Sequence, residues 1–365
     1  MHKAILLLLV VFCVEAMVQS EDKMFWNGGS TIKDESLIFI QKTPGQPATA
    51  DLLFVPEKIT SIVSTINGTI YAEGKDYIWK PGSNRLELTP DSHIGYLQSS
   101  NLFKPQNAPE SLPAKIDDPQ TNLLFYRTDG FLKLQVAVSY SFADKWRGIT
   151  PPCAVKLLPR TVEKLKSGKL NIALTGDSIS VGWNSSATVK VKPFLPSYPD
   201  QFRKGLENIY KANVKLDNYA VAGRTAGWGL INTTDKVIGS KPDLVIIAYG
   251  MNDLSAYKDA GMFQSKITDI MNKCRNALPN VEFLIISPAL GNPEWCNTPW
   301  ELTFKYREKL LALQGPGVAV ADLTALWADI LKQKDYYSMT GNGVNHPNDF
   351  GHMLYASFML QMFVE

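Results

Sequence analysis

The sequence of 365 residues contains only four cysteines and four histidines. None of them shows the short, regular spacing of a zinc site, so we expect no metal and no cofactor. The formal net charge is only +2, which does not indicate binding to nucleic acid or to an anionic membrane surface. Beyond the start of the chain, no apolar run is long enough to cross a bilayer. Metal-dependent, nucleic-acid-binding and membrane-embedded proteins are therefore disfavoured.

The start of the chain differs from the rest. A basic residue, Lys3, precedes an apolar run from Ala4 to Val14, and small residues follow at Ala16 and Ser20. This pattern is typical of a secretory signal peptide that is cleaved near Ala16 or Ser20. The apolar run is shorter than the roughly 20 residues of a membrane span, although an uncleaved anchor is the alternative. We expect an exported protein with no stable membrane insertion.

Cysteine usage leaves the disulfide pattern open. Cleavage of the signal peptide would remove Cys13 and leave Cys153, Cys274 and Cys296. An odd number allows at most one internal disulfide. Cys274 lies on the apolar face of a predicted helix, so a buried thiol is the alternative for this residue.

After the signal peptide (1–20), residues 21–150 show the pattern of a β domain. Short β-branched and aromatic runs are separated by Asn-Gly and Glu-Gly-Lys turns, and "LKLQVAVSYSF" alternates apolar and polar residues. Residues 101–120 contain four prolines, which favours an irregular loop there. We predict a small antiparallel β-sandwich as an accessory domain.

A linker (151–168) leads to a segment of different character, residues 169–365. Apolar runs now alternate with helical patterns, and the strand candidates are "LNIALTG", "VKLDNYA", "DLVIIAYG", "VEFLIIS" and "GVAVADL". Alternation over five strands predicts an α/β fold with a parallel sheet covered by helices on both faces. In such sheets, ligands bind at the carboxyl ends of the strands. Polar residues just after these strands are therefore the candidates for a site.

Four short stretches follow strands or lie near the C-terminus: "GDSIS" (176–180), "NYAVAGRT" (218–225), "YGMND" (249–253) and "NGVNHPNDFGH" (342–352). Together they resemble the four blocks of the SGNH (GDSL-type) hydrolase superfamily of esterases and lipases. The resemblance covers residues 169–365. It implies a three-layer, flavodoxin-like α/β/α domain and an acetylesterase-like carboxylic ester hydrolase.

The resemblance also implies roles for individual residues. Ser178 matches the nucleophile of the first block, and its backbone N–H matches an oxyanion donor. Gly223 of the second block and Asn252 of the third match the other two donors of the oxyanion hole. His346 of the last block matches the general base. Each also has an ordinary alternative: a helix cap for Ser178 or Asn252, a turn for Gly223 and a buried loop residue for His346.

Elementary chemistry supports the same assignment. A serine hydroxyl such as that of Ser178 is a poor nucleophile without a base, and imidazole suits that task. Of the histidines beyond the signal peptide, His93 falls in the β domain and His352 one turn into a predicted helix. His346 precedes Pro347, which favours an extended loop that can face the sheet edge.

The chain departs from the family at one position. The superfamily places an aspartate three residues before its histidine, where this sequence has Gly343. The nearest candidate to orient His346 is Asn342. A backbone carbonyl, or a distant carboxylate such as Asp322 or Asp335, is an alternative, and impaired catalysis is another.

The sequence indicates less about the substrate than about the reaction. Trp183 and Trp228 lie close after the first and second blocks, and Trp295 and Trp300 follow in "GNPEWCNTPW". Aromatic rings beside a cleft stack on sugars or pack in a core. We expect a small-molecule or polysaccharide ester, with O-acetylated carbohydrate first. The alternatives are a non-catalytic glycan-binding protein and a lipase or lysophospholipase, and the oligomeric state stays open.

Overall fold

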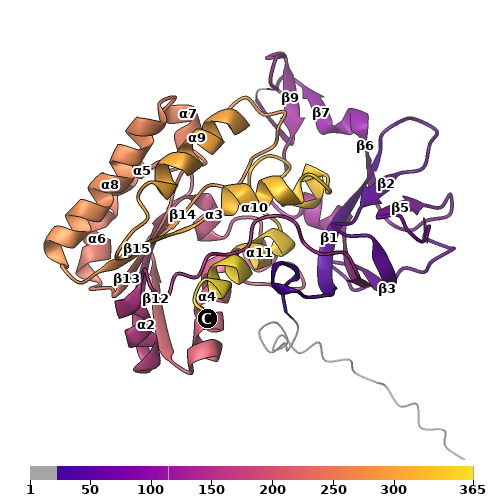
Figure 1. Cartoon of the computed structure of the whole chain (residues 1–365). Helices are drawn as coiled ribbons and strands as arrows, with labels where there is room; N and C mark the ends of the chain where they lie inside the picture. The colour runs from indigo at the N-terminus through magenta and orange to yellow at the C-terminus, as the bar shows by residue number, and fades with distance from the viewer. Residues whose placement is uncertain (1–22, 114, 365) are drawn as a thin grey trace, which may run out of the picture.

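The computed structural model describes residues 23–113 and 115–364, so the predicted signal peptide lies outside the described residues. Figure 1 shows two parts: the N-terminal strands on one side, and the later sheet with its helices on the other. Within the described ranges, no helix is long and apolar enough to cross a membrane. Cys153 and Cys296 are exposed thiols, and Cys274 is buried on its helix as a free thiol.

The N-terminal part contains a seven-stranded sheet with the order β3-β10-β1-β2-β5-β4, in which β6 also pairs with β1. All of its neighbouring strands are antiparallel except β1 and β6. The strands are β1 (Thr31–Gln41), β2 (Thr49–Asp51), β3 (Pro56–Ser64), β4 (Tyr77–Trp79), β5 (Arg85–Leu88), β6 (Tyr96–Gln98) and β10 (Gln135–Phe142). The predicted antiparallel sheet is confirmed, apart from that one pair, and its arrangement as a sandwich stays a prediction.

Two details of the N-terminal part differ from the prediction. The proline-rich segment 101–120 is not wholly irregular, because a small antiparallel sheet starts in it: β7 (Phe103–Pro105) and β8 (Ser111–Leu112) pair with β9 (Thr121–Leu124). Pro105 ends β7, which is an edge strand, and the other three prolines lie outside the strands, so none of them interrupts the strand pairing. The segment "LKL" is helical, in α1 (Gly130–Leu134), because three residues of alternation do not distinguish a strand from a helical turn.

The second part contains five parallel strands in the order β12-β11-β13-β14-β15, which confirms the predicted sheet. This 2-1-3-4-5 order is that of flavodoxin-like folds. The strands are β11 (Lys169–Gly176), β12 (Asn213–Asn218), β13 (Leu244–Ala248), β14 (Glu282–Ile286) and β15 (Val318–Ala321). Because β12 and β13 both flank β11, the loops after these three strands lie next to one another.

Helices cover both faces of this sheet. On one face, alternate strand residues such as Leu174 and Ile246 pack with α2, α4, α10 and α11. On the other, residues such as Ala173 and Val245 pack with α5, α6, α8 and α9. The helices are α2 (Pro159–Lys166), α3 (Ser178–Val181), α4 (Tyr198–Tyr210), α5 (Ala226–Asn232), α6 (Thr234–Gly239), α7 (Asp253–Ala256), α8 (Ala260–Ala277), α9 (Trp300–Leu311), α10 (Leu323–Ile330) and α11 (Asp349–Gln361).

One hydrophobic core runs through both parts. Phe39 and Tyr140 of the first sheet belong to the same buried cluster as Trp327 of α10 and Phe358 of α11. Polar contacts cross the same boundary, since Asn348 Nδ2 donates to Ser36 Oγ (2.9 Å). The division into an accessory domain (21–150), a linker (151–168) and a hydrolase domain (169–365) therefore stays a prediction.

Candidate active site

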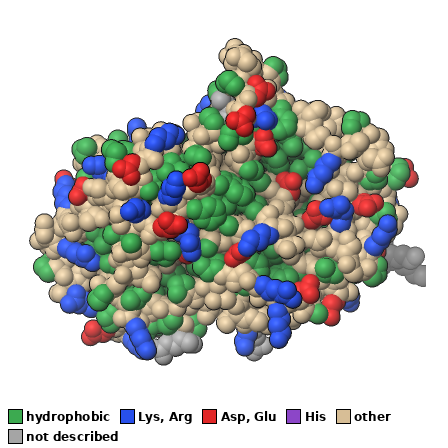
Figure 2. Space-filling model, turned by 45° about the horizontal axis from the view of Figure 1, so that its top comes forward, with side chains coloured by type: hydrophobic (Ala, Val, Ile, Leu, Met, Phe, Trp, Pro, Cys, Tyr) green, Lys and Arg blue, Asp and Glu red, His purple; other side chains and the backbone are tan. Residues whose placement is uncertain are grey.

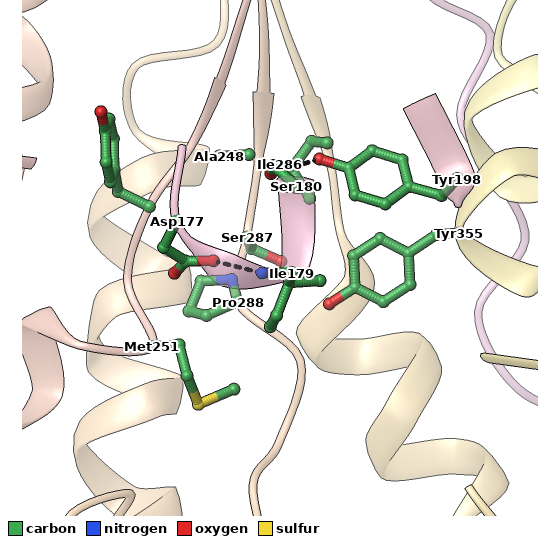
Figure 3. A pocket seen from close by; sticks show the side chains of 11 residues that line it. Asp177, Ile179, Ser180, Tyr198, Ala248, Met251, Ile286, Ser287, Pro288 and Tyr355 are labelled. Carbon is green, nitrogen blue, oxygen red and sulfur yellow. Dashed lines mark hydrogen bonds between the residues drawn. The ribbon is translucent and has the colours of Figure 1, made fainter. Parts of the chain in front are cut away.

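The turn after β11 places Ser178 at the start of α3. Asp177 caps this short helix, and its Oδ1 accepts from the Ile179 N–H (3.0 Å), as Figure 3 shows. The chain turns so tightly that a Cβ on Gly176 would lie 2.7 Å from the Ala248 carbonyl oxygen. Glycine therefore permits a sharp strand-to-helix turn that presents the Ser178 side chain beyond the sheet edge.

The two predicted catalytic residues lie in contact. His346 Nε2 is 2.8 Å from Ser178 Oγ, although 168 positions separate them in the chain. The histidine is on the loop before α11, and only 6% of its surface is exposed. A distance of this size allows the hydroxyl proton to move to the imidazole.

The other ring nitrogen of His346 faces Asn184. Asn184 Oδ1 lies 2.7 Å from His346 Nδ1, and its Nδ2 donates to the Thr128 carbonyl oxygen (3.0 Å). A carbonyl only accepts, so it fixes which end of the amide faces the ring. Nδ1 must then carry the proton, and the lone pair of Nε2 faces Ser178.

The structure contradicts Asn342 as the orienting residue. Its Oδ1 accepts from the backbone N–H groups of Val344, Asn345 and His346 (2.9, 2.9 and 3.1 Å), so it shapes the loop and does not touch the ring.

The two distant carboxylates are also engaged elsewhere. Asp322 pairs with Arg307 and caps α10, and Asp335 accepts from the Tyr337 N–H. The Nδ1 side of the imidazole faces a neutral amide in place of a carboxylate.

The three predicted oxyanion donors follow neighbouring strands. The N–H groups of Ser178 and Gly223 have no acceptor among the described residues. Gly223 has a φ of +74°, and a Cβ there would meet nothing within 4 Å, so glycine serves its backbone conformation rather than a close approach. Asn252 Nδ2 donates to the Arg224 carbonyl oxygen (3.1 Å), which joins the second and third blocks. Their joint action on an oxyanion stays a prediction.

Two buried aspartates hold these loops together. Asp253 accepts from the N–H groups of Ala226 (2.8 Å) and Gly250 (3.0 Å), and Asp177 accepts from Ile179 and Met251. Burial raises the pKa of Asp253 to about 7 and that of Asp177 to about 7, and the charge of Asp253 adds to the second shift. Each carboxyl group therefore positions the loops that carry the candidate site residues.

Burial also sets the ionisation of the histidines. It lowers the pKa of His346 to about 3, with a smaller contribution from His352. Burial likewise lowers the pKa of His352 to about 4, and its Nδ1 accepts from the Tyr198 N–H (3.4 Å). Both imidazoles are therefore neutral near pH 7, and His346 is free to accept a proton.

The two predicted substrate-binding tryptophans have different surroundings. The Trp183 ring centre lies 5.9 Å from that of His346 in an edge-on arrangement, and 37% of the residue is exposed. The Arg224 guanidinium lies over the Trp228 ring, with its central carbon 4.9 Å from the ring centre. Trp183 therefore lies beside the histidine, whereas Trp228, on α5, packs against Arg224 of the second block. Sugar binding by either ring stays a prediction.

A cavity lies apart from the contact between Ser178 and His346. It has a volume of about 350 Å³ and is lined by Phe103, Trp300 and Tyr336 among others, but not by Ser178 or His346. Figure 2 shows hydrophobic side chains gathered in the middle of one face, surrounded by charged ones.

Comparison with known families decides the class of the protein. Residues 174–354 match the model of the GDSL-like Lipase/Acylhydrolase family. This segment of the chain belongs to that family. No curated protein matches the chain.

Several solved structures align with parts of this chain. A two-domain esterase (CEX) active on acetylated mannans is 21% identical with a TM-score of 0.46, over 60% of this chain and 56% of the other. The acetylxylan esterase Axe2 from Geobacillus stearothermophilus is 17% identical with a TM-score of 0.43, over 54% and 94%. The acetyl xylan esterase AlAXEase is 18% identical with a TM-score of 0.42, over 53% and 100%. The chain spans just over half of the length of the first, and similarity of this degree does not identify its substrate.

Sequence reasoning missed two residues of this hydrolase site. Asn184 lies in an ordinary polar stretch, and only its long-range contacts reveal it. Asp253 follows Asn252 directly and ties the start of α5 to the third block. Its only sequence signal is its place beside a candidate donor.

Proposed function

We propose that this hydrolase cleaves its ester through an acyl-enzyme formed on Ser178. The observation that supports this most directly is the contact of 2.8 Å between Ser178 Oγ and His346 Nε2. Ser178 Oγ attacks the acyl carbon while its proton moves to His346 Nε2. The tetrahedral intermediate collapses, the ester C–O bond breaks, and His346 returns the proton to the leaving alcohol. Water then attacks the acyl group with His346 again as base, which releases the acid and regenerates Ser178.

The negative charge on the oxyanion is the largest charge that must be stabilised in this reaction. We assign its stabilisation to the N–H groups of Ser178 and Gly223 and to Asn252 Nδ2. Such donors are preorganised, and loss of one costs about 10²–10³ in turnover. The oxyanion also offsets the positive charge that His346 gains in its buried position, where no carboxylate faces the ring.

The proposed substrate is a short-chain ester on a carbohydrate, first of all an O-acetyl group. Trp183 supports this, because a half-exposed indole beside the catalytic imidazole offers a flat apolar surface for a sugar ring. We also propose export of the protein, on the basis of the signal-peptide pattern at its start.

The test of the mechanism is labelling with a fluorophosphonate, which phosphonylates activated serines. We expect one adduct on Ser178 in the folded protein, and loss of both the adduct and aryl acetate hydrolysis in Ser178→Ala. The control is Ser167→Ala, which changes an exposed serine just before β11, at the end of the strand opposite to Ser178. Labelling elsewhere, or hydrolysis that survives Ser178→Ala, would refute the proposal.

The substrate is tested with a panel of acetylated glycans and with aryl esters of increasing chain length. Release of acetate, and a fall in kcat/KM from acetyl to octanoyl esters, is the expected result. A preference for long acyl chains would instead support the lipase alternative within the same family.

A further inference from the structure

We propose that Asn184 is the positioning residue for His346, and that the N-terminal part of the chain holds Asn184 in place and so completes the active site. This inference rests on the proposed function of Ser178 and His346. It assigns a role in the reaction to a part of the chain that lies outside the region matched by the family, residues 174–354.

The first step concerns the side chain of Asn184 itself. It is 1% exposed and sits at a φ of +64°, a conformation that few residues other than glycine adopt and that asparagine tolerates. Both ends of the amide are used, one towards His346 Nδ1 and the other towards the Thr128 carbonyl oxygen. A side chain with only acceptors or only donors cannot serve both partners.

The second step is the effect on the ring. In serine proteases, replacing the triad aspartate by asparagine lowers turnover by about 10⁴, because the amide then favours the wrong imidazole tautomer. In this chain, the Thr128 carbonyl binds the NH₂ group, so only the amide oxygen can face Nδ1. The neutral amide therefore selects the tautomer that lets Nε2 act as a base.

The third step explains the absence of the family's aspartate. Gly343 occupies that position with a φ of +90°. A Cβ there would lie 2.6 Å from the Leu124 carbonyl oxygen and 2.7 Å from the Phe131 ring. The N-terminal part thus fills the space that a side chain at this position needs, and the orienting contact comes from Asn184 instead.

The same N-terminal segment also binds the histidine loop directly. The Tyr126 N–H donates to the Asn342 carbonyl oxygen (3.1 Å), and Gln135 Nε2 donates to the Thr340 carbonyl oxygen (2.8 Å). Together with the Thr128 contact, three hydrogen bonds from residues 126–135 fix the loop and its orienting amide. The segment therefore acts on the reaction through Asn184 and the loop.

The test compares Asn184→Ala and Asn184→Asp with the wild-type full chain. In Asn184→Ala we expect kcat to fall about 10²–10⁴-fold with KM within about threefold, because the base loses its orientation and not its substrate. The matched control is Asn122→Ala, which removes another buried amide, one that donates to Ser111 Oγ (2.9 Å). Its kcat should stay within about threefold of the wild type.

Asn184→Asp separates orientation from mere packing. The carboxylate still accepts from Nδ1 but repels the Thr128 carbonyl, so we expect kcat to fall in this variant too. Its charge favours the imidazolium, so the acid limb of kcat/KM should move to higher pH by at least about one unit. A structural role alone would leave the pH profile unchanged.

A second readout is independent of turnover. In ¹⁵N NMR spectra, we expect the His346 ring to show a protonated Nδ1 and a bare Nε2, and Asn184→Ala to yield a mixture of tautomers. Wild-type kcat in Asn184→Ala, or an unchanged tautomer, would overturn the inference while leaving Ser178 labelling intact. If the wild type hydrolyses no ester, the proposed function fails, and the tautomer still tests the pairing of Asn184 with His346.

The role of the N-terminal part is tested by placing an aspartate at position 343, where the family has one. Adding Gly343→Asp to Asn184→Ala should not restore kcat, because Leu124 and Phe131 occupy the space required. Recovery of kcat to within about tenfold of the wild type would show that the space is free and would refute that part of the proposal.

Discussion

At the residue scale, the site depends on neutral groups in a buried setting. His346 faces an amide on one side and a hydroxyl on the other, so among the described residues no carboxylate pairs with its ring nitrogens. The charge that develops on the substrate must therefore be balanced mainly by the oxyanion donors. This places more weight on those donors than in an enzyme with a complete acid triad.

Asn252→Ala tests how much the oxyanion donors contribute to turnover. Removal of its amide should lower kcat by about 10²–10³-fold with KM changed less than about threefold, because the donor acts mainly in the transition state. The measurement is steady-state hydrolysis of an aryl acetate. Asn232→Ala, an exposed asparagine on α5, is the control. A change confined to KM would show that Asn252 binds substrate and does not stabilise the oxyanion.

The pH dependence follows from the burial of His346. Burial lowers its pKa to about 3, so the free protein keeps a neutral base as pH falls and loses it only near that value. We expect the carbon-bound ring protons of His346, assigned with His346→Gln, to show no titration between pH 8 and about pH 5 in NMR spectra. A midpoint near the ordinary value of about 6.5 would contradict a buried, neutral imidazole.

At the scale of secondary structure, the sequence predicted most of the elements that depend on local pattern. The apolar run Leu244–Ala248 forms β13 as expected, because a strand buried on both faces needs continuous apolar residues. The loop before α11 also follows a local signal, because Pro347 comes directly after His346. Asn184 could not be predicted in this way, because its partners His346 and Thr128 lie 162 and 56 positions away.

Gly176→Ala tests the turn between β11 and α3. Its Cβ would lie 2.7 Å from the Ala248 carbonyl oxygen, so β11 and β13 must separate or the turn must shift. We expect a loss of about 1–3 kcal/mol in the free energy of unfolding in urea, together with a large loss of kcat. The matched control is Gly239→Ala at the end of α6, where a Cβ meets nothing within 4 Å and should stabilise by up to about 1 kcal/mol. Equal effects of the two substitutions would contradict the close approach.

At the scale of the whole molecule, the two parts are joined by a buried ion pair as well as by the common core. Lys334, from the segment after α10, pairs with Glu35 of β1, and both side chains are fully buried. Tyr140 and the Leu53 N–H also donate to Glu35 (2.5 and 2.9 Å), and Lys334 Nζ donates to the Ser36 carbonyl oxygen (3.0 Å). This network spans the boundary that the sequence predicted between two domains.

Lys334→Met should therefore destabilise both parts together. It leaves Glu35 buried without its cation, which costs about 3–5 kcal/mol in comparable pairs. Urea unfolding followed by far-UV circular dichroism and by tryptophan fluorescence should give a single transition at lower urea. The control is Lys332→Met, which removes a lysine whose side chain is 69% exposed and which should change stability by less than about 0.5 kcal/mol. Two separate transitions in the wild type would show that the N-terminal part unfolds alone, so that the continuous core and the ion pair do not couple it to the hydrolase fold.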